Sequence, residues 1–144
     1  MKLLIAFIVA AIFILPSCQQ QTSADTEGNP MVELRYEQNE TVSYYEAIEM
    51  FEKLASHYPE ARLLTYGMTD AGKPLHLFVM SKDRDFDPET VKNDGKSVVL
   101  INNGIHPGEP EGIDASIWFA DDVLRNHDGM KALLDSTVVC IIPV

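Results

Sequence analysis

The chain has 144 residues and a formal net charge of −11, from 11 lysines and arginines against 22 aspartates and glutamates. This length suits a single domain. The negative charge argues against binding to nucleic acid or to an anionic lipid surface, because both need a basic protein surface. The composition, with 46% apolar and 23% charged residues, is that of a globular protein. Two cysteines allow at most one disulfide, which excludes a small domain held together by several.

The amino terminus has the pattern of an export signal. Lys2 is followed by thirteen residues without a charge or strongly polar group, Leu3 to Leu15. This run is shorter than the about 20 residues that span a bilayer. A buried core helix is an alternative, but the terminal position and the following Pro16 favour a cleaved signal peptide over residues 1–17.

The sequence Leu-Pro-Ser-Cys at residues 15–18 resembles the bacterial lipobox, whose cysteine is lipidated and begins the mature protein. We therefore predict that Cys18 carries lipid and that the protein is an exported, membrane-anchored lipoprotein of a bacterial cell envelope. An unmodified cysteine after ordinary cleavage is the alternative. Residues 18–33 are expected to contain this cysteine and a polar tether, because no aromatic or large aliphatic residue lies between Gln19 and Pro30.

Residues 34–144 are predicted to form one incomplete domain. A helix is expected over residues 43–57, where Ser43 and Glu46 have the spacing of a capping box and apolar residues recur at helical intervals. Apolar runs at 61–68 and 74–81 flank a glycine-containing turn and predict a hairpin. Residues 83–96 are expected to be a polar loop.

The following residues predict a strand, a helix and a second strand. The strands, 97–103 and 137–144, are continuously apolar, which is typical of strands covered on both faces. The helix, 110–126, has an apolar stripe made by Ile113, Ile117, Ala120 and Leu124. The solvent-facing side is expected to hold Asp114, Asp121, Asp122 and Arg125. Such a unit indicates the α/β class with a parallel strand pair.

The turn between this strand and helix carries the strongest candidate for chemistry. It lies at the carboxyl end of a strand, which is where ligands bind in open α/β sheets. His106 and Glu109 are three residues apart in a turn that holds two prolines, and imidazole and carboxylate are suitable zinc ligands. The spacing alone is a weak signal and favours the alternative of a loop histidine and a glutamate whose charge stabilises the helix start.

The residues around this pair extend the pattern. The stretch from Gly104 to Gly112 resembles the zinc-binding turn of the metallocarboxypeptidase family. The sequences His-Tyr-Pro at 57–59, Tyr-Gly-Met-Thr at 66–69, Gly-Lys-Pro-Leu at 72–75 and Val-Met-Ser at 79–81 resemble that family's amino-terminal pattern in order. The resemblance covers about residues 40–144. It implies the amino-terminal half of an α/β/α sandwich with a mixed, mainly parallel sheet, and His106 and Glu109 as two of three ligands of one zinc ion.

The resemblance also implies which groups this chain lacks. The family's second zinc histidine, the arginine that holds the substrate carboxylate and the glutamate that activates water all follow the strand matched by residues 138–144. We therefore expect an amino-terminal fragment with no catalytic residue of its own, inactive alone. His57, His76 and His127 are all poorly placed by the predicted elements to be the third ligand.

The implied function is zinc-dependent hydrolysis of the peptide bond at the carboxyl end of a peptide substrate. One alternative is a deacylase or amidohydrolase of the same fold that acts on a small acylated amino acid or a cell-wall peptide. The Pro107-Gly108 pair between the two ligands favours a peptidase, because those deacylases typically have Gly-Asn there. A second alternative is an envelope lipoprotein without enzymatic activity.

Overall fold

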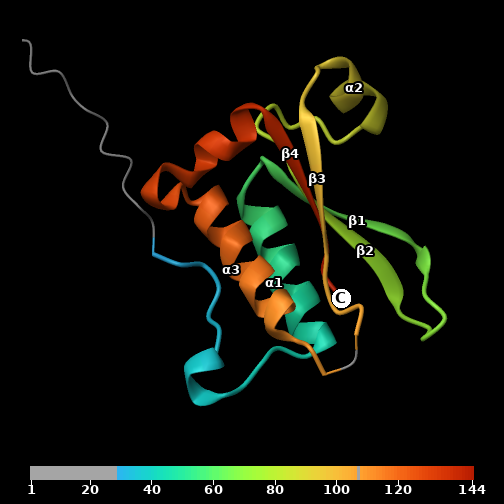
Figure 1. Cartoon of the computed structure of the whole chain (residues 1–144), viewed down its shortest axis with the longest axis vertical. Coiled ribbons are helices and arrows are strands. Elements are labelled where there is room, and N and C mark those ends of the chain that lie inside the picture. Colours follow the sequence, from blue (N-terminus) through green and yellow to red (C-terminus); the bar gives the residue numbers. More distant parts are fainter. Residues whose placement is uncertain (1–28, 107) are drawn as a thin grey trace, which may run out of the picture.

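The structure is a computed structural model that describes residues 29–106 and 108–144 (Figure 1). The predicted signal peptide and Cys18 lie outside these residues. The elements in chain order are η1 (Tyr36–Gln38), α1 (Tyr44–His57), β1 (Ala61–Met68), β2 (Pro74–Met80), α2 (Pro88–Asn93), β3 (Ser97–Asn102), α3 (Glu111–Leu124), η2 (His127–Asp135) and β4 (Thr137–Ile142). In the described part of the chain, no helix has the length and apolar character needed to cross a membrane.

The strands form one mixed sheet in the order β1-β2-β4-β3. β1 and β2 are an antiparallel hairpin, β2 and β4 are antiparallel, and β3 and β4 are parallel. The β3–β4 register runs from Ser97 opposite Thr137 to Asn102 opposite Ile142. The α/β class, the hairpin and the parallel strand–helix–strand unit predicted from the sequence are thus confirmed.

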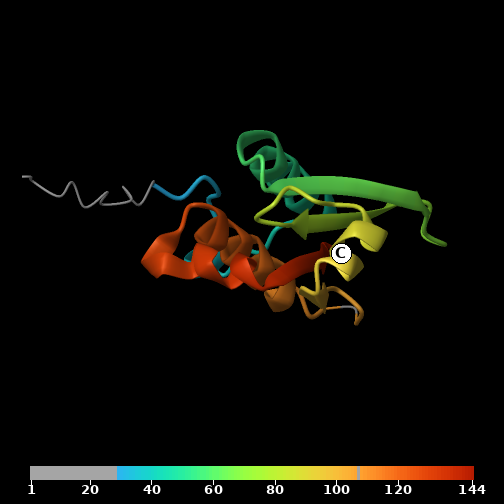
Figure 2. The ribbon, with the colours of Figure 1, turned by 90° about the horizontal axis from the view of Figure 1, so that it is seen from above.

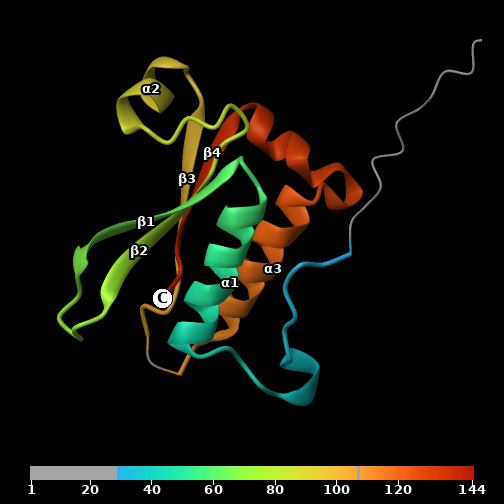
Figure 3. The ribbon, with the colours of Figure 1, turned by 180° about the vertical axis from the view of Figure 1, so that it is seen from behind.

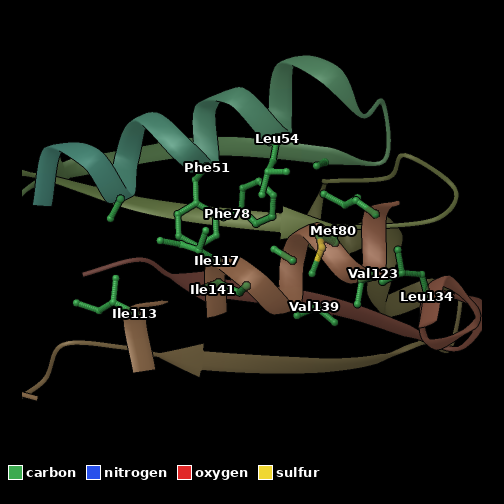
Figure 4. Packing of buried hydrophobic residues seen from close by; sticks show 14 of the residues in the cluster. Phe51, Leu54, Phe78, Met80, Ile113, Ile117, Val123, Leu134, Val139 and Ile141 are labelled. Atoms are coloured by element: carbon green, nitrogen blue, oxygen red, sulfur yellow. The ribbon is translucent and has the colours of Figure 1, made fainter. Parts of the chain in front are cut away.

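Helices α1 and α3 lie side by side on one face of the sheet (Figures 1 and 3). Between them and the sheet, Phe51 of α1 packs on Phe78 of β2 with ring centroids 4.8 Å apart, and both side chains are fully buried (Figure 4). Ile117 of α3 and Ile141 of β4 complete the centre of this core. The apolar stripes predicted for both helices are therefore the faces that are buried.

A smaller cluster lies on the opposite face of the sheet, because alternate strand residues point to opposite sides. Val79 and Val138 pack there against Val91 of α2. The loop predicted over residues 83–96 contains this helix, which begins where Asp87 accepts the Thr90 N–H at 3.0 Å and Pro88 occupies the first turn. An apolar groove of about 390 Å³ remains beside the cluster. Figure 2 shows the sheet from above, with the short helix next to it.

Strand β3 forms an edge of the sheet, and its apolar residues are exposed. Val98, Val99 and Leu100 keep 57%, 46% and 58% of their surface accessible. The prediction of a strand covered on both faces is therefore wrong for β3 within the described residues, although Val138, Val139 and Ile141 of β4 are buried. The sequence pattern shows that a strand is apolar, but it does not show whether a neighbouring strand is present.

Residues 29–42, here called the amino-terminal strap, run past α3 to the start of α1 (Figures 1 and 3). Met31 and Val32, which the sequence assigned to the tether, pack against the main core. The Met31 N–H donates to Asp121 at 3.0 Å, and the Val42 N–H donates to Asp114 at 3.2 Å. The strap thus makes one partly buried and one buried hydrogen bond to one face of α3.

These contacts contradict the solvent-facing side predicted for α3. Asp121 is 1% exposed and Asp114 is 9% exposed, while Asp122 and Arg125 are partly buried and form a 2.6 Å ion pair. Burial raises the pKa of the Asp121 carboxyl, although the N–H groups of Met31 and Val32 partly offset this effect. A helical pattern places these acids away from the core, but it does not reveal that another segment covers them.

Candidate metal-binding turn

The turn that carries His106 and Glu109 connects the carboxyl end of β3 to the first residue of α3. The N–H of Asn103 donates to the carbonyl of Ile142 at 3.2 Å, which extends the parallel pairing one residue beyond β3. Gly104 and Gly108 have φ values of +63° and +81°, a backbone region that side chains strongly disfavour. The turn therefore begins at the end of the sheet and reverses sharply into α3.

The structure brings the two predicted ligands together. His106 Nδ1 lies 3.0 Å from Glu109 Oε2, and the two side chains are 67% and 66% exposed. The donor set fits a zinc ion, since an imidazole nitrogen and a carboxylate oxygen are both suitable zinc ligands and lie side by side here.

A third protein ligand is not gathered here by the described residues, which contain no group of three histidine, cysteine or acidic side chains arranged to hold a metal. His76 lies on the hairpin, where its ring contacts Thr65 Oγ1 at 3.1 Å. His57 packs on Tyr58 at the end of α1, and His127 begins η2 beyond the carboxyl end of α3, whereas the turn adjoins the amino end of that helix. Cys140 is a free thiol on β4.

Two acids near the turn have different environments. Glu111 is exposed in the first turn of α3, as expected for an acid at a helix start. Asp114, for which the sequence suggested the same solvated position, is buried and accepts the Val42 N–H. Asp114 therefore holds the strap.

A polar connection below the turn was not identified from the sequence. Asn103 is buried, with 7% of its surface exposed, and its Nδ2 donates a hydrogen bond to Ser116 Oγ at 2.7 Å. Ser116 is also buried, and its hydroxyl donates to the carbonyl of Ile113 at 2.9 Å. The only sequence signal was that Asn103 ends the strand predicted over residues 97–103, and no motif connects it to Ser116, thirteen residues later.

Solved structures similar to this one are carboxypeptidases and related proteins. Thrombin-activatable fibrinolysis inhibitor has 25% identity and a TM-score of 0.63, and the match covers 87% of this chain and 30% of that chain. The bovine form of that protein, in complex with a tick carboxypeptidase inhibitor, has 24% identity and a TM-score of 0.58, with coverage of 73% and 31%. Carboxypeptidase A from Helicoverpa armigera has 20% identity and a TM-score of 0.60, with coverage of 74% and 24%.

The chain thus spans about a quarter to a third of the length of these solved relatives. A comparison with curated proteins finds no match. The family model described as zinc carboxypeptidase matches residues 47–144, which is more than half of the chain and includes the turn with His106 and Glu109. The fold, the matched region and the position of this turn agree, and the chain belongs to the zinc carboxypeptidase family.

Proposed function

We propose that this chain supplies the amino-terminal part of a carboxypeptidase domain and that His106 and Glu109 are two ligands of its zinc ion. The observation that carries the proposal is the 3.0 Å approach of these two side chains in a turn at the carboxyl end of β3. The turn lies inside the region that matches the family model. The substrate class that follows is a peptide, cleaved at its carboxyl end.

Zinc held at this position would act as a Lewis acid toward the carbonyl of the scissile peptide bond. The contribution of this chain is to hold and orient the metal, with a neutral imidazole from His106 and a carboxylate from Glu109. Both side chains are exposed, so a peptide and further protein groups can approach them. Two ligands alone leave the ion weakly held, and we infer that the chain has no appreciable peptidase activity by itself.

The test measures zinc binding and peptidase activity for the full chain and its His106→Ala variant. His76→Ala is the matched control, because the half-buried His76 lies in the hairpin, where its ring is hydrogen-bonded to Thr65. We expect His106→Ala to weaken zinc binding at least tenfold and His76→Ala to leave it unchanged. A chromogenic peptide with a free carboxyl end should not be hydrolysed by any of the three proteins.

Two results would contradict the proposal separately. Unchanged zinc affinity in His106→Ala would show that this residue is not a ligand. Peptide turnover by the full chain that disappears in His106→Ala would show that the chain is active alone and that the inference of inactivity is wrong.

We also propose that the protein is an exported lipoprotein anchored through Cys18. Support comes from Lys2, the apolar run that follows it, and the Leu-Pro-Ser-Cys sequence. The strap packs on the domain from Met31, which leaves the thirteen residues 18–30 as the proposed connection to the membrane. Fully extended, thirteen residues reach about 45 Å, so the domain would stay close to the bilayer.

Growth of the producing bacterium with labelled palmitate tests this anchor. The wild type and Cys140→Ser should both incorporate label, and Cys18→Ser should not. The Cys140→Ser variant is the control for loss of a cysteine as such, because that residue lies within the folded domain. Equal labelling of the wild type and Cys18→Ser would refute the anchor.

A further inference from the structure

We propose that Asn103 is a positioning residue for the metal pair, acting through Ser116 to fix the two ends of the turn that carries His106 and Glu109. This inference rests on the proposed function of that pair as zinc ligands. Among the described residues, Asn103 forms no hydrogen bond with either ligand, and it lies directly after the last residue of β3. Its role follows from what its backbone and side chain join.

Asn103 is hydrogen-bonded to the sheet through its backbone and to α3 through its side chain. Its N–H bonds the carbonyl of Ile142, which fixes the start of the turn to the end of β4. Its Nδ2 donates to Ser116 Oγ at 2.7 Å, and Ser116 donates in turn to the carbonyl of Ile113. The chain of bonds therefore connects the residue that opens the turn to the first turn of α3, which follows Glu109 closely.

Close packing restricts this connection further. A Cβ atom added at Gly112 would lie 3.2 Å from Asn103 Oδ1, tighter than ordinary van der Waals contact. A Cβ atom at Gly104 would meet Val144 Cγ1 at 3.4 Å and Ile113 Cδ1 at 3.5 Å, at a residue whose φ of +63° already favours glycine. The amide of Asn103 thus sits between the strand end and α3 with little space to move.

We infer that the start of α3 depends on this connection, because no side chain of the preceding residue caps the helix. The residue before the helix, Pro110, makes no side-chain capping bond. Within the described residues, the side chains of His106 and Glu109 are hydrogen-bonded to each other and to no other side chain. The buried Asn103–Ser116 bond connects the two ends of the turn, and we infer that it limits how far these two ligands can move apart or reorient.

Loss of this bond should weaken metal binding more than its effect on folding explains. A metal site requires its ligands to be held within about 0.5 Å of their bound positions. Supporting residues around metal ligands typically contribute 10–100-fold to affinity. Asn103→Ala removes the donor to Ser116 and leaves space beside Gly112, so the turn can adopt several geometries before it binds zinc.

The experiment measures zinc affinity of the full chain by competition with a chromogenic chelator, well below the thermal transition of each protein. Asn103→Ala should bind zinc about 10-fold or more weakly than the wild type. Asn102→Ala is the matched control, since Asn102 is an exposed residue of the same type one position earlier. This variant should bind zinc as tightly as the wild type does. The visible absorption of the cobalt-substituted proteins gives a second readout, and it should change in Asn103→Ala only.

Ser116→Ala serves as a milder variant if Asn103→Ala fails to fold. It removes the same bond from the helix side and should also weaken zinc binding. Because the two residues act through one bond, the double variant should bind zinc no more weakly than Asn103→Ala. Additive losses would refute the proposed path through Ser116.

The outcomes separate this inference from the function on which it rests. If His106→Ala abolishes zinc binding while Asn103→Ala and Ser116→Ala match Asn102→Ala, the metal assignment stands and the positioning role is refuted. If His106→Ala leaves zinc binding unchanged, the ligand assignment fails, and any effect of Asn103→Ala no longer concerns this pair.

Discussion

The exposed edge of β3 should make the described domain self-associate, and a single charge on this edge should suppress it. An apolar edge strand presents unpaired backbone groups and apolar side chains to other chains. The tested change is Leu100→Lys, because Leu100 is 58% exposed and belongs to neither buried cluster. A lysine there should therefore leave the core of the monomer unchanged while it opposes edge-to-edge pairing.

The size of the effect follows from the exposed fractions. Burying a valine or leucine side chain completely contributes about 1.5–3 kcal/mol. Val98, Val99 and Leu100 are each about half exposed, so covering them contributes about 2–5 kcal/mol per edge. The share of Leu100 is about 0.9–1.7 kcal/mol. When two copies pair this becomes about 1.7–3.5 kcal/mol, which corresponds to roughly a 20- to 300-fold weaker association.

Sedimentation velocity of residues 29–144 over a range of concentrations measures this association. The wild type should form dimers or larger species at micromolar concentrations, and Leu100→Lys should require much higher concentrations. Leu133→Lys is the matched control, because Leu133 is 48% exposed on η2 and not on a strand edge. A wild type that remains monomeric with a sharp thermal transition, or equal behaviour of the two lysine variants, would refute the reasoning.

Three further predictions concern stability. Phe51→Ala should lower the free energy of unfolding by about 3–5 kcal/mol in urea, because the ring is fully buried against Phe78; a loss below 1 kcal/mol would contradict this packing. The wild type should lose stability relative to Asp121→Asn as pH rises through the raised pKa of the Asp121 carboxyl, because a group whose pKa is raised by folding stabilises the protein only below that pKa. Thermal unfolding of both proteins between pH 4 and 7 measures the difference, and parallel curves of melting temperature against pH would argue against it. Hydrogen bonds from Ser43 and, to a smaller extent, from Arg35 lower the pKa of Glu46 from 4.5 to about 2. The contribution of the Glu46 carboxylate to stability should therefore be present above pH 4.5 and fade as pH falls toward 2. Unfolding followed by circular dichroism should show that stability depends less on pH in Glu46→Gln, and the same pH profile in both proteins would contradict this role of Glu46.

The sequence predicted the elements whose signals are local. The capping box of Ser43 and Glu46 is present at the start of α1, and the predicted strands and α3 begin and end within two residues of their observed bounds. The contact between His106 and Glu109 also depends on a short segment, so their spacing in the turn was sufficient to suggest it. Their role as zinc ligands stays a prediction.

The features that the sequence did not predict depend on residues far apart in the chain. Asp121 appeared solvent-facing because its helix pattern says nothing about Met31, ninety residues earlier, which covers it. Asn103 has no pattern that connects it to Ser116. The exposure of β3 depends on which strands adjoin it, and an apolar run has the same appearance at an edge and at the centre of a sheet.

The strap has a consequence for sequence variation among relatives. It lies before residue 47, where the family match begins, yet its N–H groups are the partners of Asp114 and Asp121. These two acids are seven residues apart, two helical turns, so one face of α3 is adapted to a segment outside the matched region. In relatives that lack such a segment, acids at these positions would have no strap N–H groups to bind. We therefore expect the segment and the two acids to be present together or absent together in related sequences.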